Sequence, residues 1–255
     1  MSDEANATYR TAVTDTMNNH VTVRFFTNEP IPDEMLQAIL DAARRAPTSN
    51  NMQTYSIVVV RNQETKKQLA VLAHNQKHIE TAQVFLAFCA DIKRLEAVGE
   101  MHGQPLVKTL ETTLTATVDA AIVGMSVQTA AESFGLGAVM IGAMRNHPDK
   151  AAALLGLPTG VYVVFGMCLG WPDWDKVPAQ KPRLPKSLVV HEEQYSREVP
   201  VAVLRQYDRE LAAYYGRQDR NLDDAAWTGV IAERQSKPSR PHLRGVLEEL
   251  GFRFD

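Results

Sequence analysis

The chain has 255 residues, of which 45% are hydrophobic and 22% charged, as is ordinary for a globular protein with a buried core. Its formal net charge of −3 provides no basic field, so nucleic acid is not an expected partner. Cys89 and Cys168 both lie in apolar runs without a further ligand at metal-binding spacing. We therefore expect buried, reduced thiols, and neither a disulfide framework nor a metal site. The polar, acidic N-terminus and the absence of a long apolar stretch favour a cytoplasmic protein without a membrane segment.

The first part of the chain predicts helices and strands in alternation. Proline and acidic residues at 30–34 are typical of a helix start, and apolar residues then recur at helical spacing as far as the arginines at 44 and 45. A β-branched run at 55–60 is typical of a strand. The expected elements are helices over 7–19, about 30–45, 62–74 and 77–82, and strands over 55–60 and 84–90.

A long helical pattern follows from about residue 106 to 133. From Val118 onward it is apolar or small on nearly every side, which predicts a helix buried at the centre of a domain or against a partner subunit. The glycines at 135 and 137 end it. A strand over 138–141, a helix over 147–155 and a strand over 161–169 complete an α+β or α/β layered core.

The pattern changes after Gly170. Prolines at 172, 178, 182 and 185 exclude a regular helix over 171–187, and helices are expected again over 199–215 and about 240–250. We predict two domains, a core over 1–195 and a helical C-terminal extension over 196–255 that packs on the core.

Familiar motifs can mostly be set aside. The run from Gly135 to Met140 has Met in place of the third glycine of a dinucleotide fingerprint, and it joins a helix to a strand, the reverse of the required order. His78 and His147 are isolated, as surface or helix-cap histidines are.

Two basic segments far apart in the sequence are more informative. Lys181 and Arg183 stand between stiffening prolines, and His20, Thr22 and Arg24 form a second donor set. Guanidinium and ammonium groups suit a phosphate and an electron-poor ring. The alternative is two exposed, solvated loops.

A polar loop over 47–51 provides hydroxyl and amide groups between a helix and a strand. These groups are typical of a simple turn, but they could also bind the edge of a planar heterocycle, with an amide added by Gln76. At Ile141 and Gly142, bare backbone could approach such a ring because glycine has no Cβ.

Taken in order, these segments resemble the nitroreductase superfamily, over about residues 10–255. The nearest branch contains the major oxygen-insensitive nitroreductases and the NADPH–flavin oxidoreductases. The segments that carry the resemblance are 20–27, 44–53, 75–78, 88–91, 136–137, 141–142, 145–146, 170–172, 181–185, 206–208 and 214–215.

The resemblance implies an α+β flavoprotein fold, with a central mixed or antiparallel sheet flanked by helices. It also implies a homodimer with FMN at the subunit interface, and NAD(P)H-dependent oxidoreductase activity by a ping-pong mechanism through flavin N5. Nitroaromatics, quinones and free flavins are the candidate acceptors. FMN performs the hydride chemistry, so no side chain is expected to be catalytic.

The family's cofactor contacts can be carried over to matching positions. The resemblance assigns the FMN phosphate and ribityl chain to His20, Thr22, Lys181 and Arg183. It assigns the pyrimidine end of the ring to Arg24, and ring or ribityl atoms to Thr48, Ser49, Asn50 and Gln76. The backbone at Ile141 and Gly142 would face N5.

Two positions and one loop depart from the family pattern. Val21 replaces a cation, and Asn51 replaces an apolar or aromatic residue that lines the substrate pocket in relatives. In the loop over 216–224, Arg217 and Arg220 are the candidates for the nicotinamide 2′-phosphate, but three acids accompany them. NADPH and NADH therefore both stay open as donors. So do two other functions: a specialised reductive dehalogenase or flavin oxidase, and a flavin-binding redox sensor without turnover.

Overall fold

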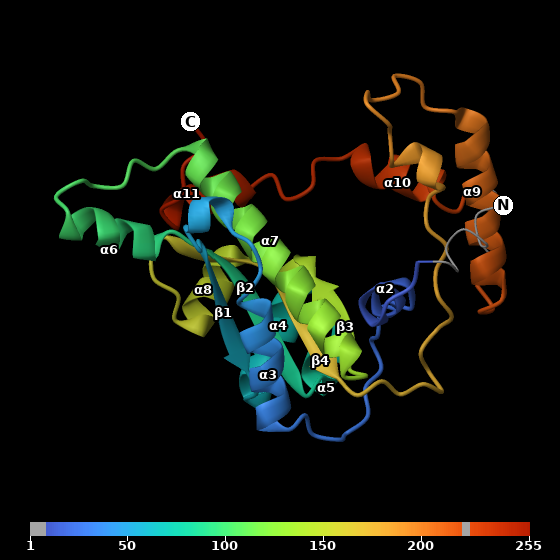
Figure 1. The fold of residues 1–255 in the computed structure, drawn as a ribbon, viewed down its shortest axis with the longest axis horizontal. Coiled ribbons are helices and arrows are strands. Elements are labelled where there is room, and N and C mark those ends of the chain that lie inside the picture. Colours follow the sequence, from blue (N-terminus) through green and yellow to red (C-terminus); the bar gives the residue numbers. More distant parts are fainter. Residues whose placement is uncertain (1–8, 221–224) are drawn as a thin grey trace. The chain divides into compact units, whose positions relative to one another are not determined.

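The computed structural model describes residues 9–220 and 225–255, and Figure 1 shows the course of the chain. The chain divides into two compact units. The first contains the described residues up to Val177 together with His242–Asp255, and the second is Pro178–Pro241. Residues 7, 8 and 221–224 of the expected segments lie outside the described residues.

A four-stranded antiparallel sheet forms the centre of the first unit. The strands are β1 (Tyr55–Val60), β2 (Val84–Asp91), β3 (Gly137–Ile141) and β4 (Val161–Gly170), in the order β1-β2-β4-β3. Every residue of β2 and β4 is buried. These two strands are apolar runs because helices cover both faces of the sheet. The predicted α+β fold is confirmed.

Alternate residues of β2 separate two apolar clusters. Leu86 and Phe88 join the cluster of α3 (Asp33–Ala43) and α7 (Leu110–Ser133), which lie together along one side of the sheet in Figure 1. Phe85 and Ala87 join the opposite cluster. That cluster includes residues of α4 (Gln63–Leu72), α5 (Lys77–Thr81) and α8 (Pro148–Leu155). The period of two along a strand produces this division.

The long helix α7 begins later than the sequence pattern suggested. Thr109 forms a capping box with Thr112, so the helix starts at Leu110 and not near residue 106. It ends before Gly135, whose φ of +84° favours glycine. In its middle, Gly124 packs on Phe165, where a Cβ would lie 2.4 Å from the ring atom Cζ. This glycine lets the helix lie close to β4.

Three short α-helices complete the α-helices described in the first unit. They are α2 (Ala12–Asn18), α6 (Lys93–Met101) and α11 (Leu243–Glu249). The sequence pattern did not predict helix α6. No helix in the described part of the chain is long and apolar enough to cross a membrane.

The second unit has a small core of its own. Helix α9 (Val201–Gly216) contributes Tyr207, Leu211 and Tyr214, and Ala226 completes the buried set. Helix α10 (Thr228–Gln235) was not predicted. The proline-rich stretch before α9 contains only a short 3-10 turn, Lys186–Leu188, within the described residues of this unit. The predicted boundary between domains at 195 and 196 stays a prediction, as does the packing of the extension on the core.

Candidate functional site

The first candidate segment runs beside the edge strand β3. Thr22 forms a parallel bridge with Ala138, and the Val23 amide donates to the Ala138 carbonyl at 3.0 Å. The Val23 side chain is buried against Gly137, where a Cβ would lie 2.6 Å from the valine. The close approach fixes the segment, while Arg24 is exposed.

His20 is held by an acidic side chain of α7. Its Nδ1 lies 2.6 Å from Glu132 Oε1 and 3.0 Å from Gln128 Nε2. His20 and Glu132 line a cavity of about 280 Å³ together with Gly137 and Pro172. These two contacts to α7 hold the imidazole ring in place.

A second cavity, of about 450 Å³, brings two predicted segments together. Arg24 lines it with Lys77 and His78, and Gln76 is the residue that precedes this first turn of α5. His78 Nε2 is buried without a hydrogen-bond partner. Burial lowers the pKa of His78, and the nearby Arg24 charge lowers it further. Asp173 and Lys176 also line the cavity and pair with each other at 2.6 Å, so Arg24 and Lys77 leave the lining with a net positive charge that suits an anionic ligand.

The polar loop after α3 has an unusual backbone. Ser49–Asn51 form a 3-10 turn, and φ is positive at Asn50, Asn51 and Gln53, at 46°, 58° and 53°. Thr48 Oγ1 accepts a hydrogen bond from the Gln53 amide at 3.2 Å, which closes the loop on itself. The asparagines suit this left-handed region, whereas Gln53 requires support from its surroundings.

The backbone candidates lie at the end of β3. Ile141 buries its side chain in the cluster that α4, α5 and α8 share, and Gly142 opens a 3-10 turn. A Cβ at Gly142 would lie 3.4 Å from Arg145 Nη2. Arg145 itself donates to the Val164 carbonyl at 2.5 Å. The side chain at 141 therefore anchors the strand end, and any ligand contact there falls to the backbone.

The second unit gathers the other basic candidates around α9. Lys181 Nζ lies 5.2 Å and Arg220 Cζ 4.6 Å from the centre of the Tyr215 ring. The Tyr207 hydroxyl donates to the Pro182 carbonyl at 3.0 Å, which holds the chain between Lys181 and Arg183. A predicted FMN phosphate ligand and a predicted nicotinamide phosphate ligand thus share one aromatic ring.

The two other arginines that were predicted to bind a phosphate, Arg183 and Arg217, also belong to this unit. Arg183 is exposed, and its charge partly offsets the burial that raises the pKa of Tyr207. Arg217 is exposed at the C-terminal cap of α9.

The structure therefore brings the candidates together in groups. Arg24 and the Gln76 segment share a cavity, and Lys181 and Arg220 share a ring. Sequence reasoning assigned no role to Asp119 or Tyr215. Asp119 accepts hydrogen bonds from Ser49 and Thr54 at the two ends of the polar loop. In the sequence it was visible only as a carboxylate inside an otherwise apolar helix, and such a local pattern does not show which loop the carboxylate contacts.

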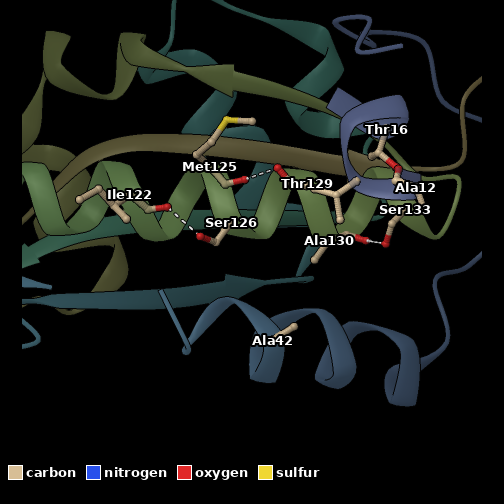
Figure 2. Close-up of a pocket in the computed structure, with 10 residues that line it drawn as sticks. Ala12, Thr16, Ala42, Ile122, Met125, Ser126, Thr129, Ala130 and Ser133 are labelled. Carbon is tan, nitrogen blue, oxygen red and sulfur yellow. Dashed lines mark hydrogen bonds between the residues drawn. The ribbon is translucent and has the colours of Figure 1, made fainter. Parts of the chain in front are cut away.

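A third cavity, of about 630 Å³, lies on the surface where α2, α3 and α7 meet (Figure 2). Hydroxyl groups line it, yet each donates to its own helix. Thr16 bonds to the Ala12 carbonyl at 2.9 Å, Ser126 to Ile122 at 3.1 Å, Thr129 to Met125 at 3.0 Å and Ser133 to Ala130 at 2.7 Å. Because their protons are already used, the cavity wall behaves as a largely apolar surface.

Comparisons with known proteins cover almost the whole chain. Residues 18–171 match the model described as the Nitroreductase family, and residues 181–255 match its C-terminal domain. The NADPH-flavin oxidoreductase of Vibrio harveyi is 39% identical over 93% of this chain and 97% of the relative. The FMN reductase [NAD(P)H] of Bacillus subtilis is 35% identical over 95% and 98%. The structure of NfrA2 from B. megaterium superposes with a TM-score of 0.92 at 35% identity, over 96% and 100%.

Proposed function

Because this chain belongs to the nitroreductase family and is an NAD(P)H-dependent FMN oxidoreductase, we propose that it reduces small electron acceptors, namely nitroaromatics, quinones or free flavins. The donor and the acceptor would use the same pocket in turn. The observation that carries this proposal is the cavity where Arg24 meets the first turn of α5.

The residues present fit FMN. The phosphate and ribityl chain need cationic and hydroxyl donors, and the donors proposed by the family resemblance are His20, Thr22, Lys181 and Arg183. The ring needs a hydrogen-bonding edge and a nearby positive charge. His78, whose Nε2 is buried without a hydrogen-bond partner, lines the 450 Å³ cavity together with Arg24.

FMN, when bound, supplies the hydride chemistry between the nicotinamide and the acceptor. The chain itself would bind and orient. Arg24 would stabilise negative charge at the pyrimidine end of the ring, and Thr48, Ser49, Asn50 and Gln76 would bond to ring or ribityl atoms. The backbone at Ile141 and Gly142 would leave room on the reacting face.

The choice of donor depends on the second unit. Arg220 lies over Tyr215, and Arg217 is exposed, so both are available to a 2′-phosphate. Asp219 carries an opposing charge beside them. We propose that both nicotinamides are used, with a weak preference for NADPH.

A spectroscopic experiment tests the function. The purified protein is expected to be yellow, or to become so with added FMN, and to bleach on anaerobic addition of NADH or NADPH. Reoxidation by a nitroaromatic, a quinone or free FMN then ranks the acceptors. Bound flavin that neither nicotinamide reduces would contradict the proposal and favour a flavin-binding protein without turnover.

We further propose that the chain forms a homodimer through α7. On the solvent side of this helix, Leu110, Leu114, Val118 and Met125 are exposed at spacings of four, four and seven residues, which places them in one stripe. The cavity of Figure 2 continues this stripe. A face that is apolar and has satisfied hydroxyl groups can be covered by a second copy without loss of hydrogen bonds.

A further inference from the structure

The loop over Thr48–Thr54 carries three of the proposed FMN contacts but has little regular structure to hold it. Three of its residues have positive φ, and Gln53 is a residue type that seldom adopts this conformation. Such a backbone persists only when its surroundings determine it. The contacts that hold the loop therefore also decide where its donors point.

Asp119 of α7 contacts both ends of this loop. Its Oδ1 accepts a hydrogen bond from the Ser49 amide at 3.1 Å. Its Oδ2 accepts from the Thr54 amide at 3.0 Å and from the Thr54 hydroxyl at 2.7 Å. The Asp119 and Thr54 side chains are both 1% exposed. One buried carboxylate thus joins the middle of the longest helix to the first turn and the last residue of the loop.

A cation holds the carbonyl side of the same segment. Arg94 of α6 donates through Nη2 to the carbonyl oxygens of Gln53, at 2.9 Å, and Tyr55. Asp91 pairs with Arg94 Nη1 at 3.0 Å and fixes the guanidinium. Two amides of the loop, those of Ser49 and Thr54, therefore contact an acid, while the Gln53 carbonyl contacts a cation. Together these contacts favour one conformation of the segment.

An acid at position 119 is required by this arrangement. Burying a carboxylate costs free energy unless hydrogen bonds compensate it, and here both oxygens are used. An asparagine has the same shape but offers one acceptor oxygen, so its NH₂ group would face an N–H donor. A local helix role would not require the two separate loop partners.

We propose that Asp119 is a positioning residue that holds Thr48–Thr54 in the conformation that binds FMN. The effect on FMN rests on the function proposed above, while the anchoring of the loop does not. Asp119 acts through Ser49 and Thr54. Its loss should therefore weaken FMN binding by more than the accompanying loss of protein stability can explain.

The experiment compares four variants of the full-length protein. Asp119→Asn replaces one acceptor oxygen by an NH₂ group that cannot accept from the loop. Thr54→Val removes the hydroxyl donor without changing the side-chain shape, and Thr54→Ser keeps that donor. Val163→Ala is the matched stability control, because Val163 is fully buried in β4 and packs in the cluster on the face of the sheet away from α7. Each protein is measured for thermal stability, for amide hydrogen exchange at residues 49–54, and for FMN release on dilution, followed by flavin fluorescence.

We expect Asp119→Asn to speed exchange of the loop amides at least tenfold and to weaken FMN binding at least tenfold. Thr54→Val should speed loop exchange and weaken FMN binding to a lesser degree. Thr54→Ser should leave both quantities at wild-type values. Val163→Ala should lower thermal stability and leave both loop exchange and FMN release within about twofold of wild type.

Three results would overturn the inference. Unchanged exchange in Asp119→Asn would show that the carboxylate does not anchor the loop. Faster exchange with unchanged FMN release would show that the anchored conformation is irrelevant to the cofactor, and the proposed function would still stand. Wild-type protein that binds no FMN would overturn the proposed function and the cofactor part of the inference together, while the exchange data would still decide the anchoring.

Discussion

Arg24 differs from the other cationic candidates in the first unit because it faces an enclosed imidazole. Its charge helps to keep His78 neutral, so the cavity keeps a net positive charge that Arg24 provides together with Lys77. A cation in this position attracts an electron-rich or anionic ring edge. Removal of the Arg24 side chain should therefore have the most direct effect on FMN binding.

We expect Arg24→Ala to weaken FMN binding or slow flavin reduction by at least tenfold. A hydrogen bond to a charged group contributes about 1.5–3 kcal/mol, and 1.4 kcal/mol corresponds to a factor of ten. FMN release and anaerobic reduction by NADPH measure the two effects. Arg44→Ala is the control, because Arg44 is also exposed but pairs with Asp41 at 3.0 Å on the surface of α3. Wild-type values for both measurements would contradict the assignment of Arg24.

The candidate residues could be named from the sequence, but their supports could not. Arg24 and Gln76 belong to polar segments whose composition indicates ligand binding, and the structure places their segments on one cavity. Asp119 was visible only as an interruption of an apolar run. Its partner Thr54 is 65 residues away in the chain, and no local pattern encodes a contact at that separation.

At the scale of elements, a second buried acid joins helices α9 and α10 of the smaller unit. Asp208 of α9 accepts hydrogen bonds from the Trp227 amide at 2.7 Å, the Thr228 amide at 2.8 Å and the Thr228 hydroxyl at 2.5 Å. Burial alone would raise the pKa of Asp208, but these hydrogen bonds outweigh it and lower the pKa. The carboxylate thereby satisfies amides at the start of α10 that the helix leaves unpaired.

We expect Asp208→Asn to lower the free energy of unfolding by about 1–3 kcal/mol at pH 7, because it leaves a buried amide or hydroxyl unsatisfied. Since the folded-state pKa is depressed, this contribution is complete above the ordinary value of 3.8 and is lost as the pH falls through the lowered value. Urea unfolding by circular dichroism at pH 7 and near pH 3 measures both. Glu210→Gln, at an exposed position of α9, is the control. An equal loss at both pH values would contradict the mechanism.

Helices with an amphipathic or capped start were predictable, and weakly patterned ones were not. Strand β1 begins and ends where its β-branched run does, at Tyr55 and Val60. Helix α6 buries none of its residues, so its short amphipathic pattern, with Leu95 and Val98 three residues apart, was passed over. Helix α10 likewise has no buried residue, and the Asp208 cap that starts it comes from another helix.

At the scale of the whole molecule, α7 has two apolar faces with different purposes. Ala116, Ala120, Val123 and Val127 are fully buried against the sheet. The opposite stripe of Leu110, Leu114, Val118 and Met125 is exposed in a single chain. The sequence pattern alone predicted burial on nearly every side, and one chain provides only half of it. An exposed apolar stripe of this kind is suited to pack against another protein surface, and a second copy of the chain would present the same stripe.

We therefore expect the protein to sediment as a dimer, and Val118→Lys to shift it toward monomer by burying an unpaired charge at the interface. Val71→Lys is the matched control, because Val71 is also an exposed valine on a helix, 63% exposed against 53% for Val118, and lies on α4, away from this stripe. Sedimentation velocity over a range of concentrations measures the shift, and FMN content is recorded for each species. If the cofactor sites require two chains, Val118→Lys should lose FMN together with the dimer. A monomeric wild type, or a Val118→Lys variant that stays dimeric, would show that α7 is not the interface.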